Sequence, residues 1–273
     1  MGKNGVGSEE MQLEVCGAKV DVTDSGSGQR AALLLHGWGC SAQMMASVAS
    51  LLETQMRVAA PDFPGHGRQG RALPPPEPWG VPEYMEMTAE IIRRLSLAPC
   101  DIVAHSFGGR VAILLAAKHP ELVGRMILTG AAGIRPPKTG KATARQQLYK
   151  GLRGAVNLAE KTHLFGSLPD RGREALVQRF GSSDYRALTP EMRKTFNKVI
   201  SLDLTDQLEK IQAPTLLYWG AQDTETPLWM GKLMEEKIPD AGLVVEEGAG
   251  HFAYLEQNAR FLRIVRSFLL EGR

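Results

Sequence analysis

Three residue types that cooperate in acyl transfer each follow a short apolar run, in the order serine, aspartate, histidine. Ser106 follows DIVAH, Asp223 follows TLLYWGAQ, and His251 follows VVEEGAG. A serine hydroxyl is a weak nucleophile until a base removes its proton, and that base is usually a histidine oriented by a carboxylate. The three residues therefore have the types needed for a nucleophile, a general base and acid, and an orienting group.

The stretch AHSFGG, residues 104–109, places Ser106 where a run of strand formers becomes an apolar helix. A sharp strand-to-helix turn strains the backbone and needs small residues two positions away, which here are Ala104 and Gly108. The helix would then direct its N-terminal amides toward an anion forming beside the serine. Ala104 departs from the G-x-S-x-G pattern, and the alternative is that Ser106 only caps the helix, since serine is a favoured N-cap residue.

The elements that must position these residues alternate along the chain from Ala31 onward. Apolar runs alternate with helical stretches, which is typical of parallel strands covered on both faces. The runs are AALLL, MRVAAP, DIVAH, RMILTG, TLLYWG and GLVVEE, and the helices are predicted at about 41–54, 82–95, 107–118, 227–237 and 252–270. Ligands of a doubly wound sheet bind beyond the carboxyl ends of its strands, and the three candidate residues lie at such ends.

Two segments depart from this alternation. MQLEVCG and AKVDVTD are short and alternating, and Gly17 between them predicts a hairpin. The chain from 133 to 203 is helical and charged, without a convincing strand, which predicts an insertion over the sheet. We therefore expect a core domain formed by residues 1–132 and 204–273, and a helical cap formed by residues 133–203.

The predicted cap is strongly basic. It contains 14 Lys and Arg residues and 6 Asp and Glu residues, a net charge of +8, whereas the whole chain has a net charge of +2. This excess either favours anionic substrates at the entrance of the site or forms a solvated helical face. The sequence leaves both interpretations open.

Five motifs, taken in order, resemble the α/β-hydrolase family over nearly the whole chain. They are LLLHGWG (33–39), DFPGHG (62–67), AHSFGG (104–109), GAQDTETP (220–227) and GAGHF (248–252). The resemblance implies a doubly wound, mostly parallel α/β sheet with a helical cap insertion. It also implies that Ser106 is the nucleophile, His251 the general base and acid, and Asp223 the orienting acid. Glu225, two residues after Asp223, is the alternative acid.

Attack on a carbonyl forms an oxyanion, which preorganised backbone N–H groups stabilise. Phe107 should supply one such N–H, because it follows the nucleophile at the start of the helix. The resemblance assigns the second N–H to Trp38 in the HGWG loop. The Trp38 side chain either walls the pocket or packs within its loop, and Phe252 is a further candidate for the wall.

The remaining histidines near the motifs are expected to have supporting roles. His36 and His66 belong to glycine-rich loops and should brace these loops by hydrogen bonds. His105 adjoins Ser106, but neighbouring side chains diverge in a tight turn, so it should support the turn and take no part in the chemistry. These three residues are therefore not expected to act as the base.

Composition narrows the class of protein. A chain of 273 residues that is 43% hydrophobic can bury a full core, and its small net charge does not suggest a nucleic-acid partner. Cys16, Cys40 and Cys100 are too widely spaced for a metal site or disulfide framework, which fits a reducing compartment. The sequence contains no signal-peptide pattern and no apolar run of about 18 residues, so we expect a cytoplasmic protein without a membrane span.

The sequence thus predicts a serine hydrolase that cleaves a carboxylic ester of a small to medium-sized substrate through an acyl-enzyme intermediate. No metal or organic cofactor is called for, because the nucleophile, base and oxyanion donors suffice for acyl transfer. Hydrolysis of a carbon–carbon bond next to a ketone is the alternative, because proteins that this sequence resembles perform it with the same triad. An alternative of another class is a ligand-binding protein that keeps the fold without turnover.

Overall fold

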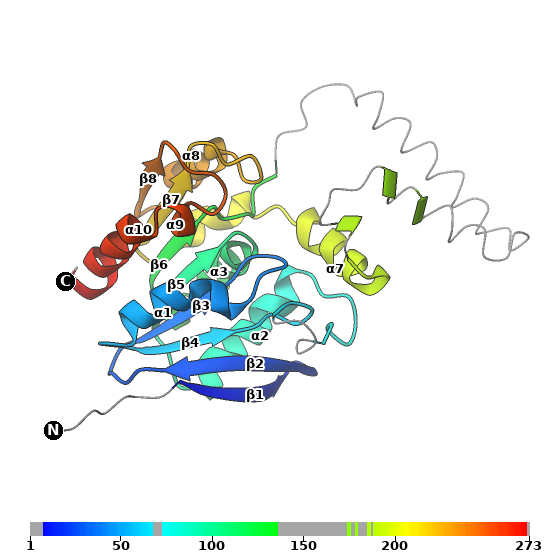
Figure 1. Ribbon diagram of the computed structural model, residues 1–273, viewed down its shortest axis with the longest axis horizontal. Helices are drawn as coiled ribbons and strands as arrows, with labels where there is room; N and C mark the ends of the chain where they lie inside the picture. The colour runs from blue at the N-terminus through cyan, green and yellow to red at the C-terminus, as the bar shows by residue number, and fades with distance from the viewer. Residues whose placement is uncertain are drawn as a thin grey trace, which may run out of the picture. The chain divides into compact units, whose positions relative to one another are not determined.

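The computed structural model of the chain describes residues 8–67, 73–135, 174–175, 178–179, 185–186 and 188–271. The chain divides into two compact units, one formed by residues 1–135 and 195–273 and the other by residues 136–194. The first unit contains the whole described sheet (Figure 1). Most of the predicted cap lies outside the described residues, so its boundaries at 133 and 203 stay a prediction.

Within the described residues, eight strands form one sheet in the order β1-β2-β4-β3-β5-β6-β7-β8. The strands β1 and β2 pair antiparallel, as do β2 and β4, and every pair from β4 to β8 is parallel. The predicted hairpin and the predicted mostly parallel sheet are therefore confirmed. The strands are β1 (Glu9–Val15), β2 (Ala18–Ser25), β3 (Ala31–Leu35), β4 (Arg57–Pro61), β5 (Cys100–His105), β6 (Val123–Thr129), β7 (Thr215–Gly220) and β8 (Ala241–Glu246).

Helices connect the parallel strands, as the alternation of apolar runs predicts. The described α-helices are α1 (Ala46–Leu52), α2 (Val81–Arg94), α3 (Phe107–Lys118), α7 (Pro190–Ser201), α8 (Leu228–Lys237), α9 (Ala253–Glu256) and α10 (Asn258–Val265). Short 3-10 helices, η1 (Ala42–Met45), η2 (Pro120–Leu122) and η3 (Thr205–Lys210), and a π-helical turn, η4 (Arg266–Glu271), complete the connections. Among the described residues, the helices are too short or too polar to cross a bilayer.

The prediction of one continuous helix over 252–270 is wrong, because this range contains the separate elements α9, α10 and η4. Gln257 leaves the helical region with φ −115° and ψ 40°, so α9 ends at Glu256 and α10 begins at Asn258. The side chain of Asn258 donates hydrogen bonds to Ser47 Oγ at 2.9 Å and to the Tyr254 carbonyl at 3.2 Å. Asparagine side chains that bond locally to the backbone in this way compete with helical hydrogen bonding, and this accounts for the break.

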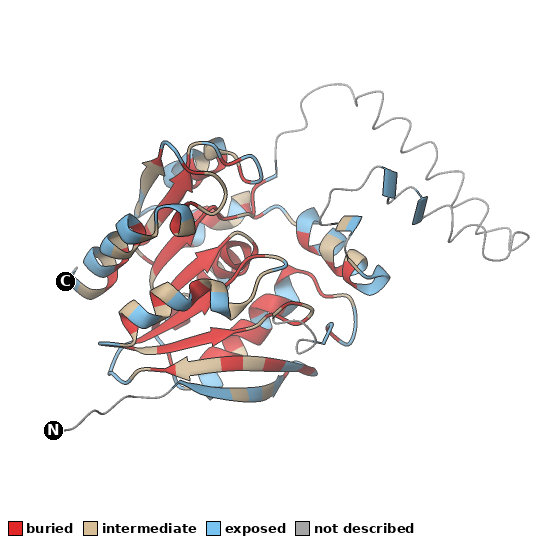
Figure 2. Ribbon diagram, viewed as in Figure 1, coloured by how far each residue is buried: buried red, intermediate tan, exposed pale blue. Residues whose placement is uncertain are grey.

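The core forms on both faces of the sheet because successive strand residues point to opposite sides. Leu33 and Leu35 of β3 pack with residues of α2, α3 and α8, whereas Ala32 and Leu34 pack with residues of α1, α9 and α10. All four are fully or almost fully buried. Figure 2 shows the central strands buried along their length, while the covering helices expose one side to solvent. This burial on both faces is the reason that the strands read as continuous apolar runs.

The sheet register brings the candidate residues to one edge. His105 of β5 is in register with Thr129 of β6, and Thr129 is in register with Tyr218 of β7. Since these strands are parallel, the loops that follow them begin at the same edge of the sheet. Ser106 opens one of these loops and Gly130 opens the next.

Candidate active site

Ser106 is held in a left-handed backbone conformation at the junction of β5 and α3. Its φ is 50° and its ψ is −107°, a combination that costs a non-glycine residue about 1–3 kcal/mol. Its backbone N–H donates to the Thr129 carbonyl at 3.1 Å, and its carbonyl accepts hydrogen bonds from Arg110 N at 3.2 Å and Ala132 N at 3.0 Å. Among the described residues, the Ser106 side chain makes no capping hydrogen bond, so the capping alternative is not supported.

The turn around Ser106 requires the glycines that follow it. A Cβ atom at Gly108 would lie 2.4 Å from the Leu35 carbonyl oxygen and 2.7 Å from the His36 carbonyl oxygen. A Cβ atom at Gly109 would lie 2.5 Å from Ala131 Cβ. Helix α3 therefore packs directly on the end of β3, which fixes the direction in which the turn presents Ser106.

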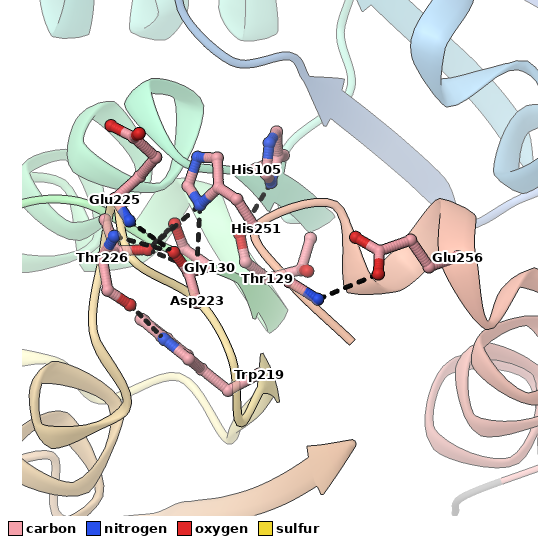
Figure 3. Close-up of polar contacts among 10 residues, drawn as sticks. His105, Thr129, Gly130, Trp219, Asp223, Glu225, Thr226, His251 and Glu256 are labelled. Carbon is pink, nitrogen blue, oxygen red and sulfur yellow. Dashed lines mark hydrogen bonds and ion pairs between the residues drawn. The ribbon is translucent and has the colours of Figure 1, made fainter. Parts of the chain in front are cut away.

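Asp223 and His251 form a hydrogen-bonded pair. His251 Nδ1 donates to Asp223 Oδ2 at 2.8 Å (Figure 3), with the aspartate side chain fully buried and the histidine side chain 15% exposed. Asp223 Oδ1 accepts the backbone N–H groups of Glu225 and Thr226, both at 2.9 Å. Burial is the largest influence on the Asp223 carboxyl and opposes its ionisation. The hydrogen bonds from His251 and Thr226 outweigh burial, so the pKa of Asp223 lies below its ordinary value.

The alternative acid, Glu225, has a different place in this structure. It contributes its backbone N–H to Asp223, and Figure 3 shows its carboxylate directed away from the Asp223 carboxylate. The carboxylate that contacts the His251 imidazole is that of Asp223. The contacts therefore favour Asp223 over Glu225 as the orienting group.

Gly130, at the end of β6, brings the Ser106 turn next to the Asp223–His251 pair. Its φ is +49°, and a Cβ atom there would lie 3.2 Å from Asp223 Oδ2 and 3.3 Å from His251 Nδ1. The preceding residue, Thr129, accepts the Ser106 backbone N–H. His105 directly precedes Ser106, and its ring centroid lies 4.8 Å from that of His251. The three candidate residues thus gather around the end of one strand.

Two backbone N–H groups are available beside Ser106. Within the described part of the chain, the N–H groups of Trp38 and Phe107 donate to no backbone carbonyl in the turns, loops and helix caps. The HGWG loop passes close to the turn, since a Cβ atom at Gly37 would lie 2.9 Å from His105 Cδ2 and 3.5 Å from Ser106 Cβ. Both unbonded N–H groups therefore belong to segments that lie against Ser106.

The predicted bracing roles of His36 and His66 are confirmed. His36 Nδ1 donates to the Gly37 carbonyl at 2.8 Å and its Nε2 accepts Phe63 N–H at 3.0 Å, while His66 Nδ1 accepts Gly39 N–H at 3.2 Å. Burial lowers the pKa of both rings, for His66 to about 3. Both imidazoles are therefore neutral at physiological pH, and together they join the HGWG loop to the DFPGHG loop.

His105 also supports the site as a neutral ring. Its Nδ1 donates to the Thr129 carbonyl at 3.0 Å. Burial, followed by the nearby charge of His251, lowers the pKa of His105 to about 3. Its contacts bind the turn to β6, as expected for a supporting residue.

The Trp38 side chain lies in an aromatic cluster at this edge of the sheet. Its ring centroid is 4.3 Å from that of His66, 5.3 Å from that of Phe107 and 5.1 Å from that of Phe196. Phe252 packs against His251, with its ring centroid 5.4 Å from that of His251. Trp38 therefore packs beyond its own loop, and Phe196 joins the cluster although the sequence gives no reason to prefer it.

Arg110 is a buried cation that the sequence analysis did not single out. It donates to the carbonyls of Val199 at 3.0 Å and Leu202 at 2.7 Å, which tie α3 to the C-terminal end of α7. Burial lowers its pKa to about 10, so the guanidinium stays charged at neutral pH. One signal was present in the sequence, because Arg110 is the only charge between Phe107 and Ala117 in an otherwise apolar helix.

The fold and the arrangement around Ser106 are those of a hydrolase built on a doubly wound sheet. Residues 32–264 match the sequence model of the Alpha/beta hydrolase family. The chain therefore belongs to the alpha/beta hydrolase family and is an enzyme of that class.

Several characterised proteins are similar to the chain over most of its length. A pimeloyl-[acyl-carrier protein] methyl ester esterase of Neisseria meningitidis is 28% identical over 86% of this chain and 92% of its own. A 2-hydroxymuconate semialdehyde hydrolase of Pseudomonas putida is 29% identical over 96% of this chain and 94% of its own. Among solved structures, a meta-cleavage product hydrolase from Pseudomonas fluorescens IP01 has a TM-score of 0.69 at 24% identity, covering 98% of this chain and 99% of that one.

Gly108→Ala should destabilise the protein and misplace Ser106. The added methyl group would lie 2.4 Å from the Leu35 carbonyl oxygen, and overpacking of this kind costs about 1–3 kcal/mol. Chemical denaturation would measure the loss in the free energy of unfolding. Gly242→Ala is the matched control, because a Cβ atom there meets nothing within 4 Å among the described residues. Equal stability of the two variants would contradict the packing argument.

The free energy of unfolding should fall as the pH is lowered below about 6.5. The folded pKa of His66 is about 3, below its ordinary value of 6.5, so between these pH values the unfolded chain binds a proton that the folded chain does not. This costs up to about 1.4 kcal/mol per pH unit. His66→Asn, which keeps an acceptor near the Nδ1 position, should reduce the slope measured by urea denaturation. If the substitution leaves the dependence of unfolding free energy on pH unchanged, the pKa of His66 is not lowered in the folded protein.

Proposed function

We propose that the chain is a serine hydrolase that cleaves carboxylic esters of small to medium-sized substrates through an acyl-enzyme intermediate. Ser106 is the nucleophile, His251 the general base and acid, and Asp223 the orienting acid. The observation that carries this proposal is the 2.8 Å hydrogen bond between His251 Nδ1 and the buried Asp223 carboxylate, beside a serine held at φ 50°. This arrangement fixes the tautomer of His251 and leaves its Nε2 to act as the base.

In the proposed reaction, His251 Nε2 takes the proton of Ser106 as the hydroxyl oxygen attacks the carbonyl carbon of the ester. The charge that develops on His251 is stabilised by Asp223, whose depressed pKa keeps it ionised. The oxyanion accepts hydrogen bonds from the backbone N–H groups of Trp38 and Phe107. Each such donor is worth roughly 10²- to 10³-fold in rate.

The second half of the proposed reaction hydrolyses the acyl-enzyme. His251 first gives its proton to the departing alcohol, and it then takes a proton from water as the water attacks the acyl carbon. Ser106 regains its proton when the tetrahedral intermediate collapses and the acid is released. These steps need no metal or organic cofactor, because the nucleophile, the base and the two N–H groups suffice.

Two observations support the ester as the substrate class and one favours a second candidate. The carbonyl chemistry of the proposed triad fits an ester, and the similar Neisseria protein is named as a methyl ester esterase. The similarity to 2-hydroxymuconate semialdehyde hydrolase and to a meta-cleavage product hydrolase favours hydrolysis of a carbon–carbon bond next to a ketone as the second candidate. Both reactions use the same three residues.

The setting of this proposed activity follows from the sequence. We propose a cytoplasmic enzyme that acts on small molecules without nucleic-acid partners, with residues 133–203 as a helical cap that shapes the substrate site. Among the described residues no disulfide joins Cys16, Cys40 or Cys100, which fits a reducing compartment. The small net charge of +2 gives no reason to expect a nucleic-acid partner.

A fluorophosphonate probe should label the wild-type protein at Ser106 and leave Ser106→Ala unlabelled. The probe forms a covalent bond only with a serine whose hydroxyl is activated by a base. Mass spectrometry of the labelled peptide would locate the bond, and circular dichroism would show that the variant is folded. Equal labelling of both proteins would remove Ser106 from the proposed role.

Nitrophenyl esters should be hydrolysed, and a vinylogous diketone should not. His251→Ala should lower kcat/KM for the ester by at least about 10³-fold, since a triad without its base keeps only the contributions of binding and the oxyanion hole. Cleavage of the diketone instead of the esters would replace the leading proposal by the carbon–carbon candidate. Absence of turnover on a broad panel would favour a ligand-binding protein.

A further inference from the structure

We infer that Thr226 is a positioning residue, whose hydroxyl completes the hydrogen bonding of the Asp223 carboxylate beside the end of β6. The inference rests on the proposed function of Asp223 and His251. Thr226 lies three residues after Asp223, is buried, and is part of the GAQDTETP motif. The motif gave the sequence analysis no reason to assign it a role.

The Thr226 hydroxyl lies between three groups of the candidate site. Its Oγ1 is 2.8 Å from Asp223 Oδ2, 3.0 Å from the Gly130 carbonyl oxygen and 3.3 Å from His251 Nδ1 (Figure 3). The hydroxyl has one proton, which it can donate to the carboxylate or to the carbonyl, and its lone pairs can accept from the His251 Nδ1–H. One side chain thus contacts the acid, the base and the strand end that adjoins Ser106.

With its single proton directed to Oδ2, the hydroxyl supplies the fourth donor of a fully bonded carboxylate. Asp223 Oδ1 accepts Glu225 N–H and Thr226 N–H, and Oδ2 accepts His251 Nδ1–H and the Thr226 hydroxyl. A carboxylate has about four lone-pair sites, so the carboxylate of Asp223 has a donor for each. Two of the four donors come from Thr226. This set of contacts holds the plane of the carboxylate and limits its basicity.

The backbone of Thr226 is held independently of its hydroxyl. Trp219 of β7, which is fully buried, donates its Nε1–H to the Thr226 carbonyl at 2.7 Å. Pro227 follows immediately with φ −55° and precedes helix α8. A substitution that removes only the hydroxyl should therefore keep the backbone donor to Asp223 in place.

Loss of the hydroxyl should change the basicity of the pair. Without this donor, Asp223 concentrates more negative charge on Oδ2 and holds the protonated form of His251 more strongly. When kcat/KM is plotted against pH, the acidic limb reports protonation of the base. This limb should then move to higher pH. A purely structural role would lower the amount of folded protein without moving this limb.

Thr226→Val tests the inference, because valine has a similar shape and lacks the hydroxyl. On a nitrophenyl ester, we expect the acidic limb to rise by roughly 0.5 to 1 pH unit and kcat to fall by roughly 3- to 10-fold, with KM little changed. Thr226→Ser keeps the hydroxyl and should restore the wild-type profile. If the valine variant does not fold, Thr226→Ala removes the same group and should show the same shift.

Thr215→Val is the matched control. Thr215 is also buried and its hydroxyl donates to the Ala213 carbonyl at 2.8 Å, but it lies at the other end of β7. This variant should lose stability and keep the wild-type pH profile. A wild-type profile in Thr226→Val, or failure of Thr226→Ser to restore it, would overturn the inference. Activity retained by Ser106→Ala would instead overturn the proposed function, so the two failures are distinguishable.

Discussion

The left-handed backbone of Ser106 depends on hydrogen bonds and close contacts from three separate segments. Its N–H is bonded to the end of β6, its carbonyl to Ala132 and to the first turn of α3, and that turn packs on the end of β3 through Gly108. A strained residue persists only where the surrounding structure fixes it more than once. The same contacts set the distance between the HGWG loop and the end of β6, so the candidate N–H donors and the Asp223–His251 pair follow from them.

The distribution of charge at the carboxyl ends of the strands follows from the cost of burying charge. A buried ion is expensive unless it is paired and hydrogen-bonded. His36, His66 and His105 avoid this cost, because burial lowers the pKa of each ring and keeps it neutral. The negative charge of the site resides on Asp223, which receives two backbone N–H donors, the imidazole of His251 and a hydroxyl. The neutral rings therefore position the loops without adding charge beside Asp223 and His251.

The link between α3 and the end of α7 extends this organisation beyond the sheet. Arg110 of α3 donates hydrogen bonds to the carbonyls of Val199 and Leu202, and Arg135 donates to that of Ser201. Cations at a helix C-terminus are favourable because they meet unbonded carbonyls and the negative end of the dipole. Phe196, on the same part of α7, contacts Trp38. The segment that leaves the predicted cap is thus fixed against the loop that carries a candidate oxyanion donor.

The sequence by itself determined the order of the elements and the residue types at the strand ends. Periodicity is local, so it predicted the hairpin, the parallel strands and the bounds of α3. It did not predict that Asn258 contacts Ser47, that Arg110 contacts Val199 or that Thr226 contacts Gly130, because these partners are 211, 89 and 96 residues apart in the sequence. Only the tertiary structure decides such contacts, and with them the burial that sets each protonation state.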